Sequence, residues 1–96
     1  MSGQPQEGIV IIGRKPLLNY VTACLSLFNS GAPQVKIKAR GQAICHAIDV
    51  VELLRKAFIK DLETQNISIG TQEFRFGGKS TRVSTIDIIL LKPKKK

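Results

Sequence analysis

The chain has 96 residues and a formal net charge of +8, with 15 lysines and arginines against 7 acidic residues. This length suits one domain, and 43% hydrophobic residues are enough to build its core. No apolar run approaches the roughly 20 residues of a membrane span, and the N-terminus lacks the basic and apolar regions of a signal peptide. We therefore expect a cytoplasmic protein with no membrane partner, whose charge favours a polyanion as its ligand.

The two ends of the chain differ in composition from the rest. Residues 1–8 are mostly small and polar and are typical of a flexible N-terminal arm. Residues 93–96 (PKKK) are typical of a basic C-terminal tail. A single domain is therefore expected over residues 9–92.

The first half of the domain has the pattern of a strand, a helix and a second strand. The β-branched run at residues 9–12 predicts a strand covered on both faces, which Gly13 ends. Pro16 suits the first position of a helix over residues 17–29. The apolar residues of that helix share one face: Leu17, Leu18, Val21, Cys24, Leu25 and Phe28. Apolar and basic residues alternate over 35–40, so this strand has one core face and one cationic face.

The second half has the pattern of a helix followed by a long hairpin. The helix is expected over residues 43–60, and its inner stripe comprises Ala43, Ala47, Val50, Val51, Leu54 and Phe58. Leu53 falls on the polar side, either as an ordinary exposed leucine or as a contact to a partner. Strands are predicted over residues 66–76 and 81–92, joined through Gly77-Gly78, which suits a tight turn.

The order β-α-β-α-β-β predicts an α+β fold. We expect a two-layer sandwich, with two helices on one face of a mixed four-stranded sheet and a long β-hairpin arm.

No residues have the spacing of an active site or a metal site. His46, the only histidine, falls on the solvent side of its helix, about 100° around the helix from Cys45. Cys24 and Cys45 belong to no CxxC pair, which favours two buried thiols over a disulfide or a metal site. We expect no catalytic residues, metal, cofactor or small-molecule substrate.

Basic residues gather at the ends of the first two strands. Arg14 and Lys15 lie between a strand and a helix N-terminus, where free backbone N–H groups and the helix dipole favour an anion. Lys38 and Arg40 end the second strand, on the edge of the domain where the first strand also ends. These four side chains are expected to form one phosphate-binding surface, the alternative being scattered solubilising charges.

The hairpin carries a second group of basic residues. Arg75, Lys79 and Arg82 surround its two glycines, and a cationic β-ribbon fits a DNA groove. Phe74 and Phe76 alternate with Arg75 and are expected to pack on the sheet rather than to stack on bases.

Taken together, these segments resemble the Alba family of small basic chromatin and RNA-binding proteins. The match extends from Ile9 to Lys92, and its specific parts are residues 12–16 (IGRKP), 19–21 (NYV), 37–41 (IKARG), 43–44 (AI), 47–49 (AID), 69–71 (IGT) and 82–86 (RVSTI).

The resemblance implies an Alba fold and a homodimer whose two hairpins extend as arms along a duplex. It implies largely sequence-nonspecific binding of double-stranded DNA and RNA, which coats or compacts nucleic acid at the chromosome. Tyr20 matches a family tyrosine near the bound backbone, and Phe58 matches an aromatic residue linked to dimer–dimer association. The basic positions of the family fall on Arg14, Lys15, Lys38, Arg40, Arg75, Lys79 and Arg82.

Two positions depart from the family pattern. The first basic residue after the first strand is commonly a lysine, but here it is Arg14, which acetylation cannot modify, so Lys15 is the candidate for acetylation. The position after Gly41 is often basic, and Gln42 keeps a polar side chain in the predicted binding set without a charge.

Three alternatives remain open at this point. The chain could be a ribonucleoprotein subunit that recognises structured RNA, a small phosphate-handling enzyme, or a purely structural oligomerisation module. Small acylphosphatases are also basic α+β domains, but their order is β-α-β-β-α-β, so topology separates them from this chain.

Overall fold

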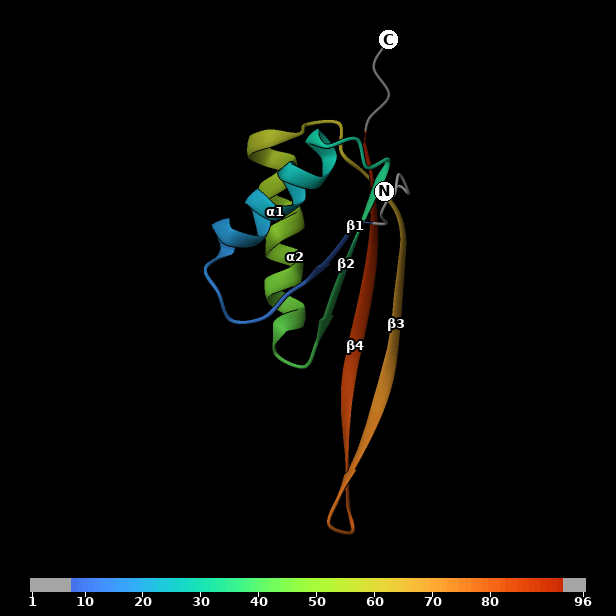
Figure 1. Ribbon diagram of the computed structural model, residues 1–96. Coiled ribbons are helices and arrows are strands. Elements are labelled where there is room, and N and C mark those ends of the chain that lie inside the picture. The colour runs from blue at the N-terminus through green and yellow to red at the C-terminus, as the bar shows by residue number, and fades with distance from the viewer. Residues whose placement is uncertain (1–7, 93–96) are drawn as a thin grey trace, which may run out of the picture.

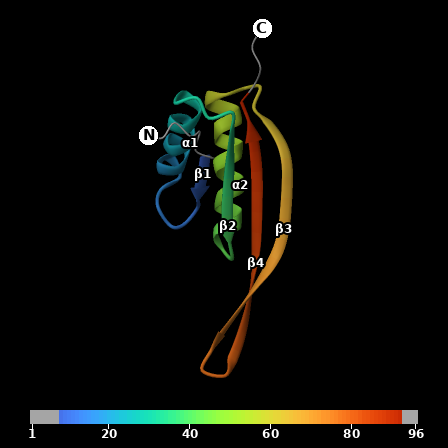
Figure 2. The same ribbon diagram turned by 45° about the vertical axis from the view of Figure 1, so that its right-hand side comes forward.

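Two helices cover one face of a four-stranded sheet in the computed structural model, which describes residues 8–92 (Figures 1 and 2). The predicted tail and residues 1–7 of the predicted arm lie outside the described residues. The elements in chain order are β1 (Gly8–Ile11), α1 (Leu17–Asn29), β2 (Gln34–Arg40), α2 (Ala43–Leu53), η1 (Leu54–Phe58), β3 (Glu63–Phe76) and β4 (Lys79–Leu91). The predicted α+β class and the β-α-β-α-β-β order are confirmed.

The sheet is mixed and has the order β1-β2-β4-β3. β1 runs parallel to β2, while β4 runs antiparallel to both of its neighbours. Ile11 pairs with Lys38, and the Ile12 backbone N–H donates to the Lys38 carbonyl at 2.9 Å. The loops that leave β1 and β2 therefore start at the same edge of the domain.

The core lies between the helices and the covered face of the sheet. Alternation in β2 buries Val35, Ile37 and Ala39 under the helices and leaves its lysines on the open face, as predicted. The largest fully buried side chains are Val21, Cys24, Val35, Ile37, Val50, Leu54 and Leu90.

The prediction that the first strand is covered on both faces is wrong. β1 is an edge strand, and its residues alternate between buried and exposed, with Ile11 71% exposed. Both helices pack on the same side of the sheet, so the other face of this β-branched run stays open. Leu18, assigned to the inner face of the first helix, is also exposed.

The second helix ends earlier than residue 60. Its last turn, η1, is a π-helical turn closed by the Ile59 N–H, which donates to the Leu54 carbonyl at 2.7 Å. A π turn holds more residues than an α turn, so a wheel drawn at 3.6 residues per turn misplaces Phe58. Phe58 is half exposed rather than part of the inner stripe, whereas Leu53 is partly buried against the core.

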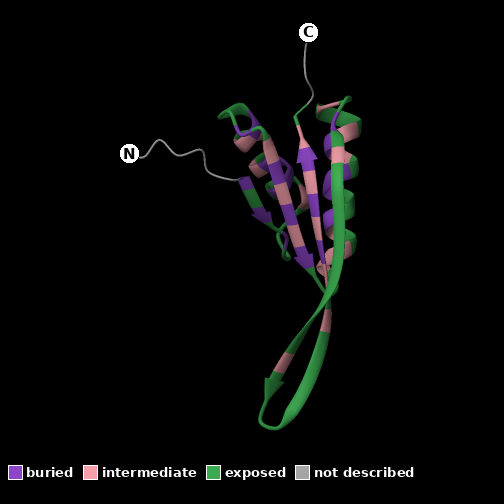
Figure 3. Ribbon diagram, turned by 90° about the vertical axis from the view of Figure 1, so that its right-hand side faces the viewer, coloured by how far each residue is buried: buried purple, intermediate pink, exposed green. Residues whose placement is uncertain are grey.

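The hairpin of β3 and β4 projects far beyond the body of the domain (Figures 1 and 3). β2 stops pairing with β4 at the Arg40–Thr85 pair, and the rest of the hairpin is a two-stranded ribbon. Gly77 and Gly78 form its turn with φ angles of 54° and 83°, as a tight hairpin turn with two positive φ values requires. Both strands begin earlier than predicted, and a bulge near Thr64 shifts their register.

Candidate nucleic-acid interface

Hydrogen bonds hold the loop between β1 and α1 in place. The Tyr20 hydroxyl accepts from the backbone N–H groups of Gly13 at 2.9 Å and Lys15 at 3.0 Å. From α2, the His46 Nε2–H donates to the Lys15 carbonyl at 3.2 Å. The tyrosine is buried and the histidine half-buried, with ring centres 6.0 Å apart in an edge-on arrangement. Tyr20 thus positions the backbone that carries Arg14 and Lys15, both of which are exposed.

Sequence reasoning missed the role of His46. Its contact with Lys15 joins residues 31 positions apart, and no periodicity reports such a pair. The only available signal was that the first loop and the second helix start at the same edge of the sheet.

Two helix N-termini open onto this edge without side-chain caps. α1 begins after Pro16 and α2 after Gln42, and neither N-terminus has a capping side chain or an acidic residue in its first turn. The first N–H groups of a helix have no partner within the helix, and they form the positive end of its dipole. Gln42 itself is exposed and makes no capping bond.

Lys38 is paired with an acid that the sequence analysis did not connect to it. Its Nζ lies 3.2 Å and 3.3 Å from the two carboxylate oxygens of Asp87 on β4, with both side chains partly exposed. Asp87 therefore offsets part of the positive charge that Lys38 contributes to the open face of the sheet.

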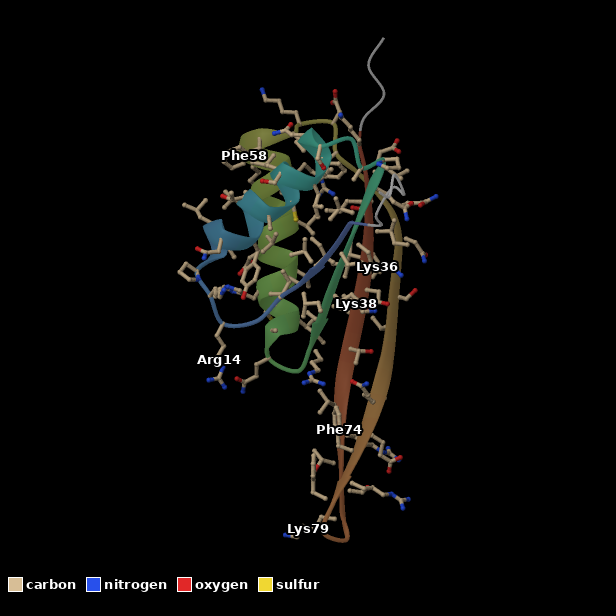
Figure 4. All side chains as sticks on the ribbon, viewed as in Figure 1. Arg14, Lys36, Lys38, Phe58, Phe74 and Lys79 are labelled. Atoms are coloured by element: carbon tan, nitrogen blue, oxygen red, sulfur yellow. The ribbon has the colours of Figure 1, made fainter. Side chains whose placement is uncertain are left out.

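Arg40 ends β2 at the base of the hairpin. Its guanidinium carbon lies 5.3 Å from the centre of the Phe74 ring, within the range of a cation–π contact. Arg40, Lys38 and Gly13 line one hollow of about 780 Å³, together with Ile11, Ile12, Ala39, Ala43, Thr71, Gln72, Thr85 and Asp87. Arg14 lies on the adjoining loop, below the helices, whereas Lys36 and Lys38 lie over the sheet (Figure 4).

The three hairpin cations do not lie on one face. Residues directly opposite each other in an antiparallel pair share a face, as do residues two apart in a strand. Because Arg82 pairs with Glu73, two residues before Arg75, both arginines lie on the same face as that glutamate. Lys79 pairs with Phe76 and lies on the other face.

The two hairpin phenylalanines lie on the face of Lys79. Their rings are nearly parallel, with centres 6.4 Å apart and planes inclined by 15°. Phe74 is half-buried, but Phe76 is 71% exposed, so the prediction that both pack on the sheet is wrong for Phe76. Phe76 lies on the face of the ribbon opposite the helices and beyond the end of β2, so neither a helix nor β2 covers this ring.

The two cysteines differ in their surroundings. Cys24 is buried in the core, and burial raises the pKa of its thiol from 9.0 to about 12. Cys45 is exposed on α2, so the prediction of two buried thiols is right for Cys24 and wrong for Cys45.

Within residues 8–92, no three or more histidine, cysteine, aspartate or glutamate residues group as metal ligands would. In the same part of the chain, no helix has the length and apolarity of a membrane span.

A mixed four-stranded sheet, two helices on one face and a projecting basic hairpin define a small basic α+β domain with an arm. The family model described as Alba matches residues 8–71. This chain belongs to the Alba family, as its sequence indicated.

Similar proteins match almost the whole chain. "DNA/RNA-binding protein Alba 1" of Archaeoglobus fulgidus is 48% identical over 86 residues, which cover 90% of this chain and 97% of that protein. "DNA/RNA-binding protein Alba" of Methanocella arvoryzae is 42% identical over 91 residues, with 94% and 95% covered. The solved structure of Alba from Thermoplasma volcanium superimposes with a TM-score of 0.82 at 39% identity, covering 88% of this chain and all of that one.

Proposed function

We propose that this protein binds DNA and RNA largely without sequence preference and coats or compacts nucleic acid as a homodimer. The names of its relatives from Archaeoglobus fulgidus and Methanocella arvoryzae support nucleic acid as the ligand. The observation that carries the proposal is the basic loop of Arg14 and Lys15, held between two uncapped helix N-termini.

This loop has the chemistry of a phosphate site. Two adjacent cations at a helix start oppose the helix dipole, which costs roughly a few tenths of a kcal/mol each. An external phosphate reverses that repulsion, because it interacts favourably with the cations and with the free N–H groups. Lys38, Arg40 and Gln42 extend the same surface toward the hairpin. Phosphates repeat along any nucleic acid, so such contacts give affinity without base recognition.

The hairpin supplies a second contact at a distance from the body. Arg75 and Arg82 share one face of an exposed ribbon, where they can follow a groove or a backbone. Glu73 on the same face accepts a hydrogen bond from the Ser80 hydroxyl at 3.0 Å. That bond occupies the acid within the hairpin, while the two arginines extend to the ligand.

An uncovered apolar surface supports the homodimer. Ile67 and Ile69 pair with Ile88 and Ile86, whose side chains are buried on the helix side of the sheet. The two β3 residues therefore face the same side, but β3 lies outside the area that α2 covers, and Ile69 is 81% exposed. Ile48 is also exposed, on the adjacent helix. A second copy of the chain packed here would bury this surface and leave two hairpins as arms.

Higher association is proposed to use Phe58, which is half exposed at the end of η1. Leu53, the other candidate from the sequence, is partly buried against the core and offers less surface.

A protein that coats DNA in this way works in the cytoplasm on the chromosome and needs no catalytic residue. Acetylation of Lys15 would remove one cation and weaken binding.

The proposal is tested with duplex DNA, duplex RNA and a folded RNA at one salt concentration, followed by a salt titration of each. Neutralisation of about six phosphates lowers affinity by about a thousandfold between 50 and 200 mM salt. We expect similar affinities for the two duplexes and this steep salt dependence. Affinity for the folded RNA far above that for both duplexes would instead support the ribonucleoprotein alternative, and salt-independent binding would contradict the phosphate mechanism.

A further inference from the structure

One face of the hairpin arm carries flat and cationic side chains in a row. Phe74 pairs with Thr81 and Phe76 pairs with Lys79, so the two rings and the lysine share this face. Arg40 lies over the ring of Phe74, at the base of the arm. From the body toward the tip come Arg40, then Phe74, then Phe76 with Lys79 directly beside it (Phe74 and Lys79 are labelled in Figure 4).

The outer ring of this row is not used in packing. Phe76 is 71% exposed and lies nearly parallel to Phe74, with 6.4 Å between ring centres. No helix covers the ribbon at this point, and no buried residue of the core belongs to residues 63–85. The ring therefore presents an aromatic surface to solvent beside Lys79, and Phe74 lies between it and Arg40.

This row of side chains begins at the edge of the hollow in the body. Arg40 and Gln72 line the hollow, and Phe74 follows two residues after Gln72 on the same side of β3. A chain bound along the open face of the body would therefore reach the aromatic rings next. Its negative charges would meet Arg40 and Lys79, and flat groups along it would meet the rings.

We propose that this aromatic face of the arm binds unpaired bases of single-stranded nucleic acid, by stacking a base on Phe76 while Arg40 and Lys79 contact the backbone. The inference rests on the proposed function, since it takes nucleic acid as the ligand. Aromatic rings interleaved with cations are what non-specific single-strand binding requires, because every base has a flat face. In a duplex the bases are already stacked on one another, so Phe76 adds nothing there. The arginine face of the ribbon and its aromatic face thus serve different ligands.

The test compares three ligands of about 20 nucleotides at one fixed salt concentration, longer than the site of a typical single-strand binding domain. They are an unstructured oligothymidylate strand, a strand of the same length with abasic sites in place of the bases, and a duplex. The abasic strand keeps the phosphates and removes the stacking partners. The variants are Phe76→Leu, which keeps the apolar bulk without the flat ring, and Phe76→Tyr, which keeps the ring.

We expect the wild-type protein to bind the oligothymidylate at least about fivefold more tightly than the abasic strand, as one stacked base predicts. Phe76→Leu should abolish this difference and leave duplex affinity within about twofold, and Phe76→Tyr should retain the difference. Unchanged thermal unfolding of both variants would show that the fold is intact, as expected for an exposed ring.

Three results would overturn the inference. Phe76→Leu could leave all affinities unchanged, it could weaken the two single strands equally, or it could change the oligomeric state, which would make the ring a protein contact. Wild-type protein that binds neither the duplex nor the abasic strand would contradict the proposed function itself. Duplex binding without a preference for the base-bearing strand would contradict the base-stacking inference alone.

Discussion

The body and the arm of this protein differ in how much of their side-chain surface is buried. In the body, the buried side chains of β2 interlock with those of two helices, and residues such as Ile37 and Leu54 have no exposed surface. In the arm, β3 and the first half of β4 are exposed almost throughout, held by pairing with each other alone (Figure 3). Packing therefore restricts the residue types in the body, whereas the residues of the arm face solvent. Substitutions in the two regions should separate stability from binding.

The largest expected effect is a core substitution in the body. Ile37→Ala removes a fully buried side chain from the middle of β2 and should lower the free energy of unfolding by about 2–5 kcal/mol. Phe76→Ala removes a larger group from the arm and should cost less than about 1 kcal/mol. Urea unfolding of both variants measures this contrast, and equal losses would show that the arm contributes to the core.

Tyr20→Phe should affect stability and binding together. It removes the oxygen that accepts from the Gly13 and Lys15 N–H groups, which should lower the free energy of unfolding by about 1–3 kcal/mol. It should also weaken duplex binding, although no charge is lost, because Arg14 is no longer held in place. Urea unfolding and a binding titration test this, and unchanged affinity would mean that the loop needs no positioning.

Asp87→Asn should change binding more than stability. The Lys38–Asp87 pair is partly exposed, so its loss should cost about 0–1 kcal/mol. Without the carboxylate, Lys38 can interact fully with a phosphate, so duplex affinity should rise a few-fold and the salt dependence should steepen by up to about one phosphate. If a binding titration gives the wild-type salt dependence, Lys38 is not a phosphate contact.

The smallest effect concerns the two thiols, which differ in their accessibility to reagents. At pH 8 a thiol reagent should modify Cys45 rapidly and Cys24 only after unfolding, because burial raises the Cys24 pKa to about 12 and thiolate is the reactive form. The unfolded thiol ionises near its ordinary pKa of 9.0, so the contribution of Cys24 to stability is complete below that pH and declines as pH rises toward 12. Counting modified thiols before and after adding denaturant tests the difference in accessibility, and two fast-reacting thiols in the folded protein would contradict it.

Much of the fold could be predicted because local patterns and tertiary packing agree in the body. The alternation in β2, the helical face containing Val21 and Cys24, and the Gly77-Gly78 turn each follow from a simple period or a backbone requirement. The β-branched run of β1 was misjudged because such a run does not reveal whether one or both faces are covered.

The predictions for Leu53 and Phe58 in the second helix are wrong for a different reason. α2 packs against α1 as well as the sheet, so its buried arc is wide enough to include part of Leu53. Phe58 falls in the π turn, where the period changes. For the candidate site, the sequence predicts a set of basic residues, but it could not reveal their contacts with Asp87, His46 and Phe74, which come from elements distant in the chain.

The most direct test of the central claim is the salt dependence of duplex binding for two double variants. Arg14→Ala/Lys15→Ala removes the two cations of the proposed phosphate site, and Lys56→Ala/Lys60→Ala removes two exposed cations at the other end of the second helix. For about six neutralised phosphates, the logarithm of affinity should fall against the logarithm of salt with a slope of about −5. The first variant should reduce the magnitude of that slope by about 2, while the second retains the wild-type slope. Equal slopes for the two variants would contradict the account, because binding would then depend on net charge and not on this loop.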